Sequence, residues 1–159
     1  MEDIWNITAL VVSVLSVLLS LYALRQATTK NTSDMYLFFI SQYAKEDMKL
    51  ALRKLKDIKR GVYRLEQWES DMKNNLPKAF EYDEARRLVK YFYDTLAYMK
   101  LEKLIEARFV RLICLKKGAW LYLDTVEAME KFFDSGYDKK PYAVIRDVCE
   151  NLRKEGCCP

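Results

Sequence analysis

The feature that most constrains this chain is an apolar run near its N-terminus, from Ile4 to Leu24, that contains no charged residue. At a rise of ~1.5 Å per residue, about 21 helical residues reach about 31 Å, the thickness of the hydrocarbon core of a bilayer. A buried helix of a water-soluble protein rarely needs that length without one charge. We therefore expect residues 1–25 to form a transmembrane anchor.

The residues that flank the run predict its orientation. Trp5 and Tyr22 lie near its two ends, where amphipathic rings prefer the membrane interfaces. Two acidic residues precede the run, whereas Arg25 and Lys30 follow it. The positive-inside rule then places the N-terminus outside the cell membrane and the rest of the chain in the cytoplasm. A cleaved signal peptide is the main alternative, but it would begin with basic residues and have a shorter apolar core.

Small residues recur along one side of the run at spacings of four and three. In a membrane such residues let helix backbones approach closely, and serine hydroxyls hydrogen-bond across the contact. One interpretation is a packing seam for a second copy or for a partner's transmembrane helix. The other is that each serine bonds to a carbonyl of its own helix. The seam consists of Ala9, Ser13, Ser16, Ser20 and Ala23.

Composition limits the remainder of the chain to one compact domain. Of the 159 residues, roughly 130 follow the anchor, which is enough for a sizeable core. With four glycines and three prolines the chain is poor in the residues that a β-sandwich uses for turns. The net charge of the chain is +4, and the part that follows Asp3 carries +6, which suits a domain near anionic lipid headgroups. This charge is too small, and too evenly mixed with acids, to indicate nucleic-acid binding.

Apolar residues repeat with the period of a helix through most of the chain, and no segment alternates with the period of a strand. We therefore expect an all-α fold: one transmembrane helix followed by a small cytosolic helical bundle. Val62, Leu88, Trp120 and Phe133 are expected to face the core. Helices are predicted over residues 46–64, 65–73, 81–103, 105–115 and 119–133, with a last one near Pro141 to Gly156. The predicted divisions are an anchor (1–25), a polar linker (26–33), a helical bundle (34–134), and a loop, C-terminal helix and cysteine-containing tail (135–159).

The order of these elements carries a resemblance. A single N-terminal span is followed by a helix with the residues Tyr43 to Met48, a helix with Ala85 to Tyr93, and a later helix that begins near Trp120. In this layout the chain resembles an uncharacterised family of prokaryotic single-span membrane proteins with a small all-helical cytosolic domain. The resemblance extends to about Phe133 and rests on hydrophobic patterns. It implies a fold and a topology, but no activity and no site residues.

Basic residues crowd the segment from Lys45 to Arg64, which has eight of them and three acids. Helical spacing places four of these on one face, away from the apolar stripe. Near a membrane such a face binds anionic lipid at roughly 1 kcal/mol per basic residue. It equally suits an acidic partner subunit, or it is an ordinary solvated surface. The candidate basic face consists of Lys49, Arg53, Lys56 and Arg60.

Three of the four cysteines, Cys149, Cys157 and Cys158, lie near the C-terminus. They are candidate redox thiols, and the alternative is that they are free reduced thiols of a tail. Cys114 lies in an apolar run and is expected in the core. Because zinc usually takes four ligands in closely spaced pairs, we expect no metal site.

The sequence lacks the usual equipment of an enzyme. It has no histidine, no glycine-rich phosphate loop and no nucleophile elbow. Tyr91, Phe92, Tyr93 and Tyr98 are typical of core and boundary positions on a helix, not of a ligand pocket. We expect no cofactor. The sequence favours a non-catalytic accessory or regulatory subunit that docks on a larger membrane protein complex from the cytoplasmic side, and one version of this hypothesis is that the subunit responds to thiol oxidation. The alternative is a membrane-surface structural or self-assembling protein that binds anionic lipid.

Overall fold

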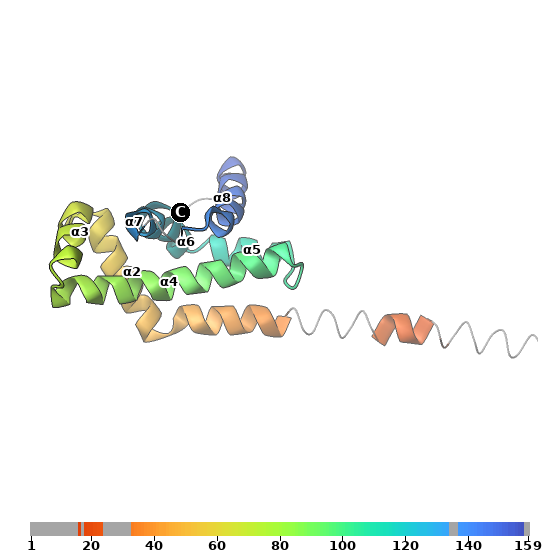
Figure 1. The fold of residues 1–159 in the computed structure, drawn as a ribbon. Helices are drawn as coiled ribbons and strands as arrows, with labels where there is room; N and C mark the ends of the chain where they lie inside the picture. Colours follow the sequence, from red (N-terminus) through yellow and green to blue (C-terminus); the bar gives the residue numbers. More distant parts are fainter. Residues whose placement is uncertain (1–15, 17, 24–32, 134–136, 158–159) are drawn as a thin grey trace, which may run out of the picture. The chain divides into compact units, whose positions relative to one another are not determined.

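The computed structural model describes residues 16, 18–23, 33–133 and 137–157. The chain divides into a segment that ends at Leu37 and a compact unit from Phe38 to Pro159. All regular secondary structure in the described ranges is helical, which confirms the predicted all-α fold (Figure 1). After helical residues 33–44, the elements are α2 (Glu46–Lys59), α3 (Leu65–Lys73), α4 (Pro77–Leu101), α5 (Ala107–Cys114), α6 (Lys117–Leu121), the π-helical turn η1 (Tyr122–Val126), α7 (Glu127–Phe133) and α8 (Lys139–Lys154).

Most of the predicted anchor, including Ala9 and Ser13, lies outside the described residues. Within the described ranges, no helix combines the length and the apolar character that crossing a membrane requires. Residues 18–23 are helical and exposed. The Ser20 hydroxyl donates a hydrogen bond to the Ser16 carbonyl oxygen at 2.8 Å. Ser20 therefore bonds to a carbonyl of its own helix, as expected if the serines of the run do not form a packing seam.

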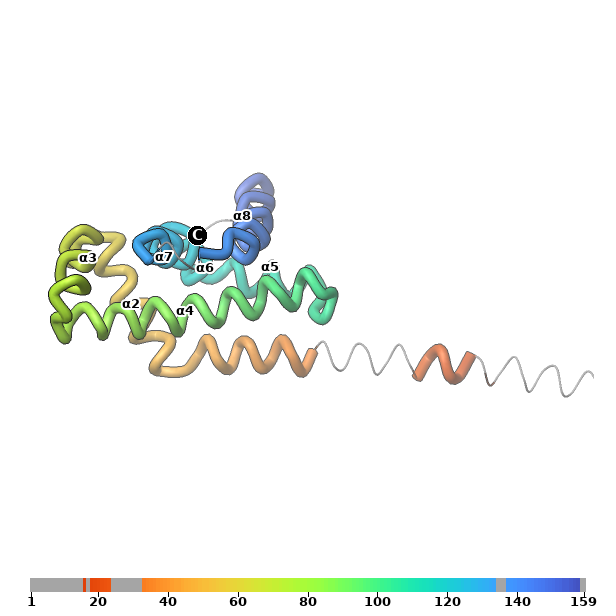
Figure 2. Tube along the Cα trace, viewed as in Figure 1, coloured from red at the N-terminus to blue at the C-terminus, as the bar shows by residue number. Residues whose placement is uncertain are grey.

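The long helix α4 is the centre of the compact unit. Helices α2, α3 and α8 and the turn η1 all pack against it. Figures 1 and 2 show α3 near its N-terminal end and α5 near its C-terminal end. Pro77 occupies the first position of α4, where the missing N–H has no helical partner to lose. Alanines on the buried face of α4, such as Ala85 and Ala97, leave room for the side chains of its neighbours.

Several predicted helix ends differ from the structure; α4, for example, was predicted over residues 81–103 and is Pro77–Leu101. Helix α2 stops at Lys59 and not at Arg64, because Gly61 adopts a left-handed conformation with φ +74° that breaks the helix. Val62 lies beyond this break and is exposed, so its predicted inward position is wrong. Residues 116–118 lie between the predicted helices 105–115 and 119–133, but Lys117 and Gly118 already belong to the start of α6.

The segment after Gly118 is interrupted by the turn η1. A π-helical turn contains one more residue than an α-helical turn, so it shifts the face on which later residues lie. The single helix predicted over residues 119–133 is therefore three consecutive pieces with a change of register. Leu123, Val126 and Met129 are buried as predicted, whereas Trp120 is half-buried and Phe133 is exposed. The inward prediction for these last two residues is wrong, as it is for the exposed Leu88.

Helix α8 packs against α4 and α5 and buries Ile145, Val148 and Leu152. The side chain of Asp138 caps its N-terminus by accepting a hydrogen bond from the Lys140 backbone N–H at 2.9 Å. The C-terminal helix thus belongs to the same compact unit as the part of the predicted bundle that follows Leu37.

Arg86 forms a buried ion cluster between α4 and α7. Its Nε donates to Asp83 Oδ1 at 2.7 Å, and Nη1 pairs with the Glu130 carboxylate. All three side chains are almost completely buried. The outer oxygen of Asp83 is also 2.7 Å from Nε of Arg87, which is 70% exposed. Two adjacent arginines thus share one carboxylate, one of them in the interior and one in solvent.

Replacing Arg86 by methionine should destabilise the protein by about 3 kcal/mol, because it removes the buried cation that Asp83 and Glu130 share and leaves them only the exposed Arg87 and the more distant Lys90. The matched variant Arg87→Met removes the exposed partner of the same carboxylate and should lose less than about 1 kcal/mol. Urea unfolding followed by circular dichroism compares the two. Equal losses would show that burial does not distinguish these ion pairs.

Candidate anion-binding cleft

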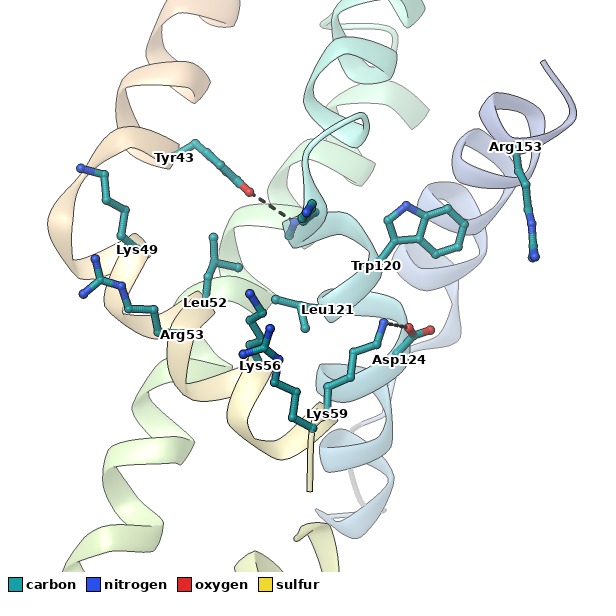
Figure 3. Close-up of a pocket in the computed structure, with 13 residues that line it drawn as sticks. Tyr43, Lys49, Leu52, Arg53, Lys56, Lys59, Trp120, Leu121, Asp124 and Arg153 are labelled. Carbon is teal, nitrogen blue, oxygen red and sulfur yellow. Dashed lines mark hydrogen bonds and ion pairs between the residues drawn. The ribbon is translucent and has the colours of Figure 1, made fainter. Parts of the chain in front are cut away.

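A cleft of about 1040 Å³ lies between α2, α6 and the C-terminal part of α8 (Figure 3). We call it the basic cleft. Cationic side chains make up about half of its lining, and the others are mainly aromatic and aliphatic. Its residues are Tyr43, Lys49, Leu52, Arg53, Lys56, Lys59, Arg60, Lys117, Gly118, Trp120, Leu121, Asp124 and Arg153.

The four residues of the predicted basic face all line this cleft. Their spacing along α2 places them on one side of the helix, as the sequence indicated. The structure adds three cations to this face: Lys59, which the sequence placed in the basic segment but not on the face, and Lys117 and Arg153, which the sequence did not indicate. Lys117 and Arg153 come from distant parts of the chain, so no local pattern connects them with α2. Seven cationic side chains thus share one cleft with a single carboxylate.

Some of these cations are paired within the protein. Lys59 Nζ lies 2.6 Å from the carboxylate of Asp124, which is the acid of the cleft (Figure 3). Lys49 lies 3.3 Å from Glu46, and Arg53 approaches the same carboxylate at 3.9 Å. These contacts are exposed and weak. Three of the seven cations, Lys49, Arg53 and Lys59, are thus already paired with carboxylates of the protein.

The other four cations of the cleft are Lys56, Arg60, Lys117 and Arg153. Across the part of the chain that the structure describes, their side chains have no ion pair and no hydrogen bond. They come from the end of α2, the start of α6 and the last turn of α8. Clefts lined by one sign of charge concentrate the field and attract ions of the opposite sign.

One edge of the cleft is built around Gly118. The Gly118 N–H donates a hydrogen bond to the hydroxyl of Tyr43 at 3.2 Å (Figure 3). A Cβ at position 118 would lie 2.7 Å from the Tyr93 hydroxyl and 3.0 Å from that of Tyr43, so a larger residue does not fit without movement. Burial raises the pKa of Tyr43, and the hydrogen bond from Gly118 partly opposes this. The close contact fixes α6, and with it Lys117 and Trp120, against Tyr43.

The chemistry that these side chains offer is binding. Ammonium and guanidinium groups attract and hold negative charge, and the indole of Trp120 and the Leu52 side chain accept apolar groups. The lone carboxylate, Asp124, is held by Lys59. The arrangement therefore suits recognition of an anionic group that also carries apolar surface.

The cysteines do not form the group that the sequence indicated. Cys149 is completely buried in α8, beside the buried Cys114 of α5, whereas Cys157 is exposed and Cys158 lies outside the described residues. A hydrogen bond from the Cys114 thiol lowers the pKa of Cys149 against the opposing effect of burial, and raises the pKa of Cys114. Grouping Cys149 with the tail thiols was wrong, because its position in α8 faces the core. The core position of Cys114 is confirmed.

In the described ranges, no group of three or more side chains that could hold a metal ion is found. Of the aromatic residues on α4, Phe92 and Tyr93 are buried, whereas Tyr91 and Tyr98 are exposed. Tyr93 stacks on Tyr122 of η1 with ring centroids 5.1 Å apart. Phe92 and Tyr93 are thus core residues, as predicted.

Comparisons with known protein families, curated proteins and solved structures found no match to this chain. The resemblance to a family of single-span membrane proteins therefore stays a prediction.

We expect Cys157 to react with iodoacetamide in the folded protein, because its thiol is exposed. Cys114 and Cys149 should react only after unfolding, since both are shielded by α5 and α8. Mass spectrometry of peptides from folded and urea-unfolded samples measures each site separately. Rapid labelling of Cys149 in the folded protein would contradict its buried position.

Proposed function

We propose that this chain is a non-catalytic accessory or regulatory subunit of a larger membrane protein complex. In this proposal the run from Ile4 to Leu24 holds it in the cell membrane, with the N-terminus outside. The helical domain then docks on an acidic partner subunit from the cytoplasmic side through the basic cleft. The observation that carries the proposal is the convergence of Lys56, Arg60, Lys117 and Arg153, without counter-charges among the described residues, on one cleft.

Four like charges in one cleft repel each other, and this repulsion weakens the fold unless an anion relieves it. A partner with carboxylates at matching positions removes the repulsion and gains attraction at the same time. The anchor adds to this effect, because confinement to the same membrane raises the effective concentration of the two partners. A modest affinity between the cleft and an acidic surface is then sufficient for stable docking.

The shape of the site supports a protein partner over a lipid surface. Leu52 and Leu121 line the cleft together with the cations, and Trp120 is half-buried in it. A bilayer surface is broad, so it meets the rim of a cleft and does not fill its interior. A projecting segment of a protein can enter and contact both kinds of side chain. The experiments below therefore distinguish docking on a protein partner from the alternative, binding to anionic lipid.

Reversing two charges of the cleft in the full chain, K56E/R60E, should reduce co-purification of partner subunits in mild detergent by at least about tenfold, which corresponds to about 1.4 kcal/mol. Like charges placed opposite the partner's carboxylates cause this loss. Quantitative mass spectrometry of the purified complex gives the ratio of subunits. Recovery of the wild-type chain as a lone homo-oligomer would contradict the proposal.

The matched control reverses two exposed lysines outside the cleft, K139E/K140E, and should leave co-purification unchanged. These residues lie in the first turn of α8, where acidic side chains are favourable for the helix. The lipid alternative is tested with the full chain in nanodiscs of neutral or anionic lipid. Protection of Lys56 from acetylation in anionic nanodiscs without any partner would favour lipid binding instead.

A further inference from the structure

The distribution of charge in the basic cleft indicates the form of its ligand. We propose that the cleft takes an extended acidic peptide segment of the partner, with one bulky apolar side chain seated against Trp120. This inference rests on the proposed function, since it concerns the same cleft, and it specifies what the partner must present.

The first argument is the length of the cationic row on α2. Lys49 and Arg60 are eleven residues apart, which corresponds to about 16 Å along a helix at ~1.5 Å per residue. A single phosphate group is only a few ångströms across and would engage one part of this row. An extended peptide advances about 3.3 Å per residue, so about five residues match the row. A series of carboxylates therefore fits the α2 side of the cleft better than one compact anion.

The second argument is the presence of cations on more than one element. Figure 3 shows the cations of α2 on one side of the view and Arg153 of α8 on the other, with Trp120 between them. In an extended segment, successive side chains point to opposite sides. Acidic side chains on both sides of the segment then meet cations of α2 on one side and Arg153 on the other. One central side chain remains for the surface between them.

The third argument is Trp120 itself. Trp120 lies in α6, just before η1, and its indole is half-buried at the cleft instead of buried in the core. The face of an indole does not attract a carboxylate, which can interact favourably only with the Nε1–H at the ring edge. A large half-buried tryptophan is instead the kind of residue that dominates the energy of a protein interface by burying an apolar side chain. Leu52 and Leu121 supply further apolar surface for the same side chain.

The test measures binding of fluorescein-labelled peptides of about a dozen residues to the full chain in detergent micelles by fluorescence anisotropy. One peptide is rich in glutamate and aspartate with a central phenylalanine, and the second has serine in place of the phenylalanine. We expect the phenylalanine peptide to bind about tenfold more tightly. W120A should remove this preference and leave the affinity for the serine peptide unchanged, whereas W120F should keep most of it. K56E/R60E should weaken both peptides at least about tenfold, and K139E/K140E neither.

The peptide substitution keeps the test independent of protein folding, because it is made on the ligand. Equal affinity of the wild-type chain for the two peptides would overturn the inference and leave docking through the cleft intact, as would a phenylalanine preference that survives W120A. Displacement of both peptides by ATP or pyrophosphate at concentrations below the peptides' own dissociation constants would overturn it in favour of a compact anion. Failure of both peptides to bind, with co-purification unaffected by K56E/R60E, would overturn the proposed function itself.

Discussion

The buried guanidinium of Arg86 is the interaction on which the arrangement of this domain depends. Arg86 lies on α4, and its carboxylate partners are Asp83 of the same helix and Glu130 of α7. Buried ion pairs add little net stability, because the charges lose their hydration, but a misplaced partner would leave a buried charge uncompensated. The cluster therefore strongly disfavours other positions of α7 on α4. Because α7 continues directly from η1 and α6, this constraint also limits where α6 can lie.

The basic cleft is a consequence of that placement. Helix α2 is held on α4 by buried residues such as Met48 and Leu55, and it also packs against α6 and η1. The hydrogen bond between Tyr43 and Gly118 fixes the edge where the two meet. Apolar packing thus holds cations of three elements in proximity despite their repulsion. A fold that keeps unfavourable charge density at one place is typical of a binding site.

The sequence predicted features that depend on local spacing. The bounds of α3, Leu65–Lys73, agree with the prediction, because the Asn-Asn-Leu-Pro turn after it is a local signal. The basic face of α2 was predicted because it depends only on the spacing of residues along one helix. The burial of Arg86 and the contact between the free thiols of Cys114 and Cys149 depend on distant segments coming together, so no pattern in the sequence indicated them. The η1 turn accounts for the misplaced Phe133, since a helical period carried through residues 119–133 assumes an unbroken register.

The central claim is that cations of α2, α6 and α8 act as one binding surface. The most direct measurement compares the affinities of the full-chain variants K56Q, K117Q and R153Q for the same acidic partner, with one cation removed from each helix. If the cleft is one site, each variant should bind about two- to tenfold more weakly than the wild-type chain, as expected for single partly exposed ion pairs. If K56Q alone weakens binding, α2 acts as an isolated basic helix face and the account of the cleft is wrong.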